Sequence, residues 1–207
     1  KALERFEEFA DKFDENPDFI YQSQEVPLPT RRWISTWMIA ASVVLGLLIG
    51  AWILQDTIIY QTHTTAFGET KSLLLSDHTK VTLNANSSLR VPRFGFGTKT
   101  REVFLTGEAN FAVTHKANNQ QFIVKTNKGL EVIVLGTEFT VYSRKQGSKV
   151  VLSKGKVQLR YQEGKTQKQL MMKPGDLVTL DPINHLKQEV TKQPEKYAAW
   201  KDHRFIF

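Results

Sequence analysis

The longest apolar stretch of the chain lies near its N-terminal end. Residues Trp33–Gln55 contain no Asp, Glu, Lys, Arg or His, and Arg31 and Arg32 directly precede them. The 22 residues Trp33–Leu54 match the roughly 20 apolar helical residues that cross a hydrocarbon core about 30 Å thick. The pattern therefore predicts a transmembrane helix at residues 33–54. A core helix is shorter or less uniformly apolar, and a signal peptide has a short basic leader, whereas residues 1–32 are long and acidic.

The residues after the apolar stretch alternate with a period of two. Val81, Leu83 and Ala85 are separated by polar residues, and the same alternation occurs around residues 103–113 and 157–161. Turn-forming residues recur about every ten positions, and residues 65–182 show no helical pattern of useful length. We therefore expect a mainly β fold, an antiparallel β-sandwich or jelly-roll-like domain at residues 62–183.

The residues before the apolar stretch have a helical period instead. The apolar residues that recur at spacings of three and four are Leu3, Phe6, Phe9, Ala10 and Phe13. They predict a short amphipathic helix that ends at Asn16-Pro17. So short a helix does not bury three Phe by itself, so we expect a partner or preceding chain to cover it. The chain also begins at Lys1 without Met, which suggests a fragment that has lost its N-terminus.

These patterns predict five segments. They are a tail at 1–32, the membrane helix at 33–54, a linker at 55–61, the β domain at 62–183, and, at 184–207, a linker with the start of a truncated C-terminal domain. Arg31 and Arg32 adjoin the N-terminal end of the helix, whereas only Lys71 follows within about 20 residues of its other end. The positive-inside rule then makes Arg31 and Arg32 the topology signal and the N-terminus cytoplasmic.

Charge and composition exclude several kinds of ligand and site. The tail has five Lys or Arg against eight Asp or Glu, and residues 56–207 have 23 against 13. Nucleic acid is not an expected ligand for a domain across a membrane, and its Lys residues are scattered. The absence of cysteine excludes disulfides, thiolate metal sites and a Cys nucleophile. Attraction of the basic domain to acidic envelope polymers remains an alternative to a plain solvated surface.

We find no catalytic constellation in the sequence. The five His show no metal-ligand spacing, and neither a G-x-S-x-G elbow nor a complete phosphate-binding loop is present. The carboxylates Glu69, Glu108 and Glu138 lie in different predicted strands. We expect no enzyme, with no catalytic, metal or cofactor-binding residues.

Seven short phrases in the predicted β domain occur in an order more specific than any one phrase. They are L-x-D-x-T-x-V-x-L-N-A-x-S from Leu75, R-x-V-x-L-x-G-E-A-x-F-x-V from Arg101, F-x-V-x-T from Phe122, V-L-G-T-x-F-x-V from Val134, V-x-L-x-x-G-K-V from Val150, Leu170 to Gly175, and W-K-D from Trp200. Over residues 62–207 the chain resembles the FecR family of anti-sigma factors, particularly its Bacteroidetes type.

The resemblance implies a transmembrane regulator in the bacterial inner membrane. The cytoplasmic region, through Leu3, Phe6, Phe9 and Phe13, would bind an extracytoplasmic-function sigma factor. The periplasmic domain would receive a signal from a TonB-dependent outer-membrane transducer, in systems that serve uptake of iron carriers or glycans. The residues of the family motif, expected to be structural, are Asp77, Asn84, Gly107, Glu108, Gly136, Thr137, Gly155, Pro174, Gly175 and Trp200. His78 and His203 stand where Gly is common in the family.

Other readings stay open at this point. A membrane-anchored β module that binds cell-wall or capsular polymer is the alternative function, followed by an envelope enzyme. Ser42, Gly46 and Gly50 form a small-xxx-small row that permits close helix contact and a homodimer. Signalling would then change association or lead to cleavage within the membrane.

Overall fold

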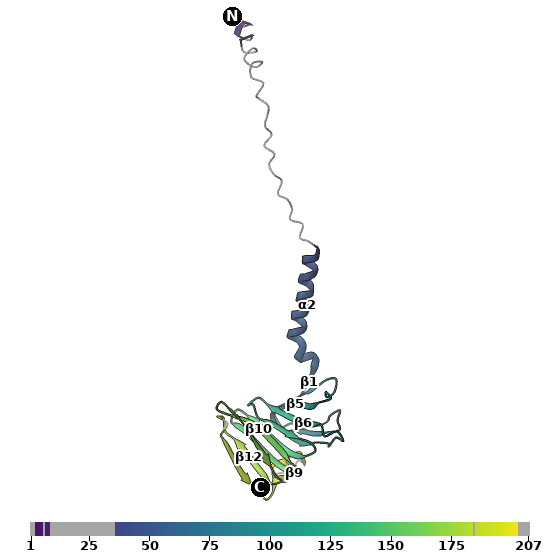
Figure 1. Cartoon of the computed structure of the whole chain (residues 1–207), viewed down its shortest axis with the longest axis vertical. Helices are drawn as coiled ribbons and strands as arrows, with labels where there is room; N and C mark the ends of the chain where they lie inside the picture. The colour runs from purple at the N-terminus through teal and green to yellow at the C-terminus, as the bar shows by residue number, and fades with distance from the viewer. Residues whose placement is uncertain (1–2, 6, 9–35, 184, 203–207) are drawn as a thin grey trace. The chain divides into compact units, whose positions relative to one another are not determined.

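The computed structural model describes residues 3–5, 7–8, 36–183 and 185–202 (Figure 1). They belong to two compact units that divide between Leu48 and Ile49. Residues 3–5 and 7–8 are helical, and Leu3 is exposed. The other predicted sigma-facing residues and the topology signal lie outside the described residues; they are Phe6, Phe9, Phe13, Arg31 and Arg32.

Helix α2 (Thr36–Ile59) contains residues 36–54 of the predicted span, and residues 33–35 lie outside the described residues. Among the described residues, its segment Trp37–Ile59 is the one helix long and apolar enough to cross a membrane, with a mean hydropathy of 2.3. The helix continues through most of the predicted linker at 55–61, and the first strand begins at Tyr60. The linker expectation differs from the structure here because residues 55–59 contain neither Gly nor Pro, so nothing interrupts the helical hydrogen bonds.

Thirteen strands follow in the described part of residues 60–190. They are β1 (Tyr60–Thr64), β2 (Lys71–Leu74), β3 (Lys80–Leu83), β4 (Ser88–Pro92), β5 (Thr100–Ala112), β6 (Gln121–Thr126), β7 (Glu131–Val134), β8 (Glu138–Arg144), β9 (Gly147–Lys154), β10 (Val157–Glu163), β11 (Thr166–Met172), β12 (Asp176–Leu180) and β13 (Leu186–Val190). The mainly β fold class is therefore confirmed.

The thirteen strands are connected by hydrogen bonds, and β5 belongs to both of the two sheets that they form, A and B. Sheet A has the order β1-β4-β5-β6-β7-β10-β11, and sheet B has the order β2-β3-β5-β8-β9-β12-β13. Every ladder is antiparallel except that between β5 and β6, which is parallel. This one pair departs from the predicted antiparallel arrangement because residues 113–120 cross over instead of forming a hairpin.

Strand β5 changes sheets at Gly107. Residues before it pair with β4 and β6, and residues from it onward pair with β3 and β8. Gly107 has a φ of 98°, which non-glycine residues rarely adopt. A Cβ atom at this position would lie 2.6 Å from Ser87 Cα. Glycine therefore permits both the bend of β5 and the close approach of the chain that precedes β4.

The hydrophobic core lies between the two sheets. Phe111 of sheet B lies 6.1 Å from Phe122 of sheet A between ring centroids, and it stacks on Phe139 at 5.2 Å. All three rings are completely buried. The period-2 alternation directs these side chains inward, and their burial is the main source of stability for such a sandwich.

The C-terminal segment packs on this β domain. Residues 184–207 were expected to be a linker and the start of another domain, but β13 pairs with β12 in antiparallel register. The 3₁₀ helix η1 (Pro194–Asp202) then contacts β9. Ala198 in η1 is only 4% exposed. The β unit therefore extends to Asp202 rather than ending near residue 183.

Candidate functional site

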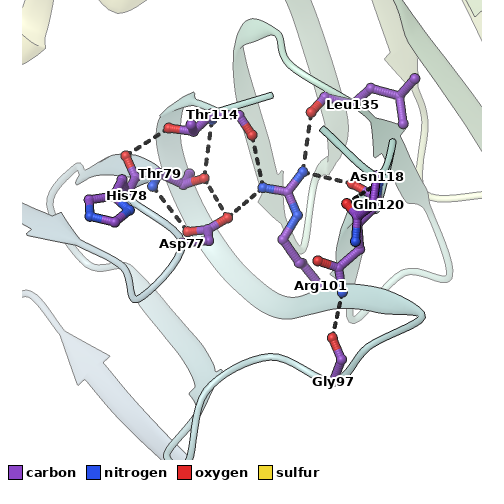
Figure 2. A network of polar contacts seen from close by, with 9 residues as sticks. All are labelled: Asp77, His78, Thr79, Gly97, Arg101, Thr114, Asn118, Gln120 and Leu135. Atoms are coloured by element: carbon purple, nitrogen blue, oxygen red, sulfur yellow. Dashed lines mark hydrogen bonds and ion pairs between the residues drawn. The ribbon is translucent and has the colours of Figure 1, made fainter. Parts of the chain in front are cut away.

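A buried ion pair joins two of the motif phrases. Arg101 in β5 is 1% exposed, and its Nη1 donates to Asp77 Oδ2 at 2.6 Å (Figure 2). Arg101 lies at the position two before Val103 and four before Leu105, so it points to the same inner face. An arginine in this apolar row is isolated from water, so the cost of burying its charge has to be offset by the ion pair and by further hydrogen bonds.

The Arg101 guanidinium also binds three backbone carbonyls. Its Nη1 donates to Thr114 O at 2.9 Å, and its Nη2 donates to Gln120 O at 2.8 Å and Leu135 O at 3.1 Å (Figure 2). Only its Nε lacks a partner among the described residues. The planar fork of arginine thus holds together the crossover at 113–120, the loop after β7 and the turn of Asp77, which a lysine with its single ammonium group does not do.

The turn that carries Asp77 is closed by the same carboxylate. Asp77 Oδ1 accepts from the Thr79 backbone N–H at 3.0 Å, and Oδ2 accepts from the Thr79 hydroxyl at 2.7 Å (Figure 2). His78 between them is exposed and has a φ of 67°. Gly is common at this position in the FecR family. The backbone of His78 is in the left-handed region, at a conformational cost for histidine.

A second polar network surrounds Glu108 on the outer face of sheet B. Asn84 Nδ2 donates to Glu108 Oε2 at 2.7 Å, and Trp200 Nε1 donates to Glu108 Oε1 at 3.0 Å. The Glu108 backbone N–H also donates to Ser87 Oγ at 2.8 Å. Three motif residues that lie far apart in the sequence, Asn84, Glu108 and Trp200, therefore meet at one carboxylate.

Two further contacts attach η1 to sheet B. Lys201 Nζ donates to Glu138 Oε1 at 3.1 Å, and Lys149 Nζ lies 5.6 Å from the centroid of the Tyr197 ring. We call this attachment the C-terminal clasp: Glu108, Glu138 and Lys149 on the sheet, with Tyr197, Trp200 and Lys201 on η1. It connects whatever follows Asp202 to the central strands β5 and β8.

The pKa values of the two carboxylates of the clasp are shifted in opposite directions. Burial raises the pKa of Glu108, although the hydrogen bonds from Asn84 and Trp200 oppose this change. Burial also acts to raise the pKa of Glu138, but the hydrogen bond and charge of Lys201, together with Lys154, outweigh it and the pKa is lowered. The clasp therefore holds one carboxylate that resists ionisation and one that favours it.

The remaining motif residues form tight backbone contacts. A Cβ atom at Gly136 would lie 2.6 Å from His115 Cβ, and the Thr137 hydroxyl donates to Lys156 O at 3.0 Å beside Gly155. Pro174 and Gly175 form the turn before β12, where the Gly175 N–H donates to Leu152 O at 2.8 Å. These residues close loops at the ends of strands.

The predicted helix-contact residues lie in α2. The Ser42 hydroxyl donates back to Ile39 O at 2.8 Å within the helix. A Cβ atom at Gly46 or Gly50 would meet nothing within 4 Å. Among the described residues, no group of three or more His, Asp and Glu is arranged to hold a metal ion.

Arg101 was not among the predicted site residues, although it begins one of the motif phrases. The available signal was the charge itself, at a position in register with the buried Val103 and Leu105. A charged residue on the inner face of a predicted strand requires a buried partner. The partner that such a charge requires is an acid, and here it is Asp77.

Comparison with known proteins agrees with this architecture. Residues 61–158 match the FecR protein family. Two crystal structures, at 2.50 Å and 1.65 Å resolution, are each of a proposed anti-sigma factor from Parabacteroides distasonis ATCC 8503. Their TM-scores are 0.63 and 0.62, both at 27% sequence identity, over 69% and 68% of this chain. None of the curated proteins matches this chain.

The alignments cover 65% and 64% of those two chains, so this chain spans just under two thirds of their length. The family match includes Asp77, Arg101 and Glu108, whereas Trp200 lies beyond it. The ordered phrases, the shared fold and the family match agree that residues 61–158 are a FecR-family domain.

Proposed function

We propose that this protein is a single-pass membrane anti-sigma factor that binds an extracytoplasmic-function sigma factor through its N-terminal region. The observation that carries the proposal is one apolar helix of membrane-spanning length followed directly by a FecR domain. The two similar structures, of proposed anti-sigma factors, support an anti-sigma role. No catalytic chemistry is needed for this role, because binding alone withholds a sigma factor from transcription.

Under this proposal the N-terminus is cytoplasmic and the FecR domain is periplasmic. Arg31 and Arg32, next to the apolar run, favour this orientation in the inner membrane. Leu3 is exposed, and together with Phe6, Phe9 and Phe13 it would form the apolar stripe that contacts the sigma factor. An amphipathic stripe in a groove of the partner is a common mode of helix recognition.

The FecR domain would receive a signal from a TonB-dependent outer-membrane transducer. The absence of any spacer between α2 and β1 supports a mechanical role for the domain, since a displacement of a rigid sandwich reaches the helix without being absorbed by a flexible linker. The C-terminal clasp supports the same role because it ties the chain beyond η1 to the central strand β5.

The deciding experiment is a pull-down of the sigma factors of the source organism with the intact cytoplasmic region. We expect one of them to be retained, and a double substitution Phe6→Ser with Phe9→Ser to abolish retention. Glu4→Ser with Glu8→Ser, which changes the polar side of the same segment, is the matched control and should retain binding. Retention of no sigma factor by the intact region would refute the proposal.

A further inference from the structure

The β domain starts at the last residue of α2. The Arg93 backbone N–H donates to Ile59 O at 2.8 Å, and the next pair in the ladder is Tyr60 with Pro92. Ile59 ends the helix and Tyr60 begins β1. One hydrogen bond therefore joins the turn after β4 to the last residue of the helix, whatever the tilt of that helix in a membrane.

This attachment determines the level of Arg93 relative to a bilayer that α2 crosses. The apolar run ends at Leu54 and Ile59 lies five residues further along the helix, which is a rise of about 7.5 Å. The polar headgroup layer extends about 5–8 Å beyond each face of the hydrocarbon core. Ile59, and with it Arg93, therefore lies at the level of the phospholipid headgroups if α2 spans a bilayer.

The side chains near Ile59 are charged or aromatic, as is suited to the headgroup layer of a bilayer. Arg93 is exposed, and Phe94 beside it has 79% of its surface exposed. Arg90 lies 3.4 Å from Asp56 in the helix, and its guanidinium lies 4.8 Å from the Tyr60 ring centroid. We name these five residues, Asp56, Tyr60, Arg90, Arg93 and Phe94, the exit collar.

The charges of the exit collar favour an anionic ligand. Two arginines face one aspartate, so one positive charge is left over, and Arg90 is the one paired with Asp56. Among the described residues, the Arg93 guanidinium makes only a long contact of 3.4 Å, to Thr57 O. A guanidinium fork binds phosphate oxygens well. Tyr rings are enriched at the membrane interface, and exposed Phe side chains insert at the boundary between headgroups and hydrocarbon.

We propose that the exit collar binds the phospholipid headgroups of the membrane that α2 crosses, with Arg93 on an anionic lipid phosphate and Phe94 inserted among the headgroups. The proposal rests on the membrane-spanning role proposed above for α2. It makes the membrane surface a binding partner of the FecR domain, so that the domain is held at the bilayer and does not swing freely about the helix end. A signal that tilts the domain then has to break these lipid contacts.

The test uses the full chain, which has no native cysteine and so accepts single spin labels. Labels are placed by the single substitutions Phe94→Cys, Phe67→Cys and Leu47→Cys. Phe67 is 88% exposed and lies in the turn that follows β1, and Leu47 lies within α2. The protein is reconstituted in vesicles of phosphatidylcholine alone or mixed with phosphatidylglycerol. We expect the Phe94 label to be shielded from a water-soluble nickel reagent, most strongly with phosphatidylglycerol, and the Phe67 label to be fully accessible.

Charge reversal then tests Arg93 itself. Arg93→Glu leaves the backbone hydrogen bond to Ile59 in place and should weaken the shielding in anionic vesicles about fivefold or more, the factor expected for a basic residue near such a surface. Lys165→Glu, an equal change of charge in the turn between β10 and β11, should leave it unchanged. Shielding that Arg93→Glu does not alter would overturn the assignment of Arg93 to phosphate.

The three labels separate the possible failures. If the Leu47 label lies inside the bilayer and the Phe94 and Phe67 labels are both fully accessible to the nickel reagent, the exit collar is overturned and the spanning role of α2 stays intact. A Leu47 label in water would overturn the spanning role itself, and the exit collar with it. Equal shielding of Phe94 and Phe67 would mean that the whole domain adheres without a specific contact at the helix exit, which also overturns the inference.

Discussion

Trp200 donates its indole N–H to the Glu108 carboxylate at 3.0 Å, across 92 residues of chain. The same N–H lies 3.0 Å from Tyr197 O in the preceding turn of η1. The two acceptors fix the indole ring between the C-terminal segment and strand β5. Together with the other contacts of the clasp, this contact ties the position of η1 to the centre of sheet B.

Trp200→Phe should loosen η1 without unfolding the sandwich. The substitution keeps an aromatic ring but removes the donor to Glu108, and loss of a hydrogen bond to a charged, half-buried group costs about 1–2 kcal/mol. Hydrogen exchange of the backbone amides of residues 194–202 measures the effect. Tyr197→Phe keeps the ring over which Lys149 lies and the carbonyl that Trp200 contacts, so exchange in this control should match the parent chain.

The stability of the clasp should fall as pH rises above 4.5. The folded pKa of Glu108 is raised by burial from 4.5, so its contribution is fully present below that value and is lost as pH rises through the folded pKa. Urea unfolding of the β domain at a series of pH values measures this slope, and Glu108→Gln should flatten it.

Glu138 supplies the opposite control for the pH series. Its folded pKa is lowered from 4.5 by Lys201 and Lys154 against the effect of burial, so its contribution is present above 4.5 and is lost as pH falls through the folded pKa. Glu138→Gln should therefore change the slope only on the acid side. A Glu108→Gln variant with the same slope above pH 4.5 as the parent chain would contradict the assignment to Glu108.

Arg101→Lys should be strongly destabilising. A lysine keeps the charge opposite Asp77 but does not reproduce four hydrogen bonds in one plane, so buried carbonyls such as Leu135 O lose their donor. We expect a loss of about 3 kcal/mol in the free energy of unfolding, because each buried carbonyl left without a donor costs about 1–3 kcal/mol. Thermal unfolding followed by circular dichroism measures it.

The surface pair of Arg160 with Glu131 at 2.9 Å is the matched control for that substitution. Both its side chains are about one third exposed or less, and Arg160→Lys there should cost no more than about 1 kcal/mol. Equal losses for the two substitutions would show that the network around Arg101 contributes nothing beyond an ordinary surface pair.

His78→Gly should stabilise the β domain. His78 is exposed with a φ of 67°, a conformation that glycine adopts without a steric penalty. Relief of that penalty, less the greater freedom of glycine in the unfolded chain, leaves a gain of up to about 1 kcal/mol. Urea unfolding measures the gain, and His78→Ala, which keeps a Cβ atom, should show none of it.

The local elements of this protein were accessible from sequence because their signals are local. The absence of charge between Trp33 and Gln55 predicts the membrane helix, and alternation around Val103 and Leu105 predicts a strand with one buried face. The end of that helix at Ile59 was missed because a polar residue such as Asp56 ends an apolar run without ending the helical hydrogen bonds.

The amino-acid sequence by itself thus determined the class of fold, the place of the apolar helix and the set of motif residues. The tertiary structure decided which of those residues meet: Asp77 with Arg101, and Asn84 with Glu108 and Trp200. It also decided the parallel pairing of β5 with β6 and the packing of η1 on sheet B. The physical reason is that periodicity reports which face of a strand is buried, whereas pairing depends on contacts between residues distant along the chain.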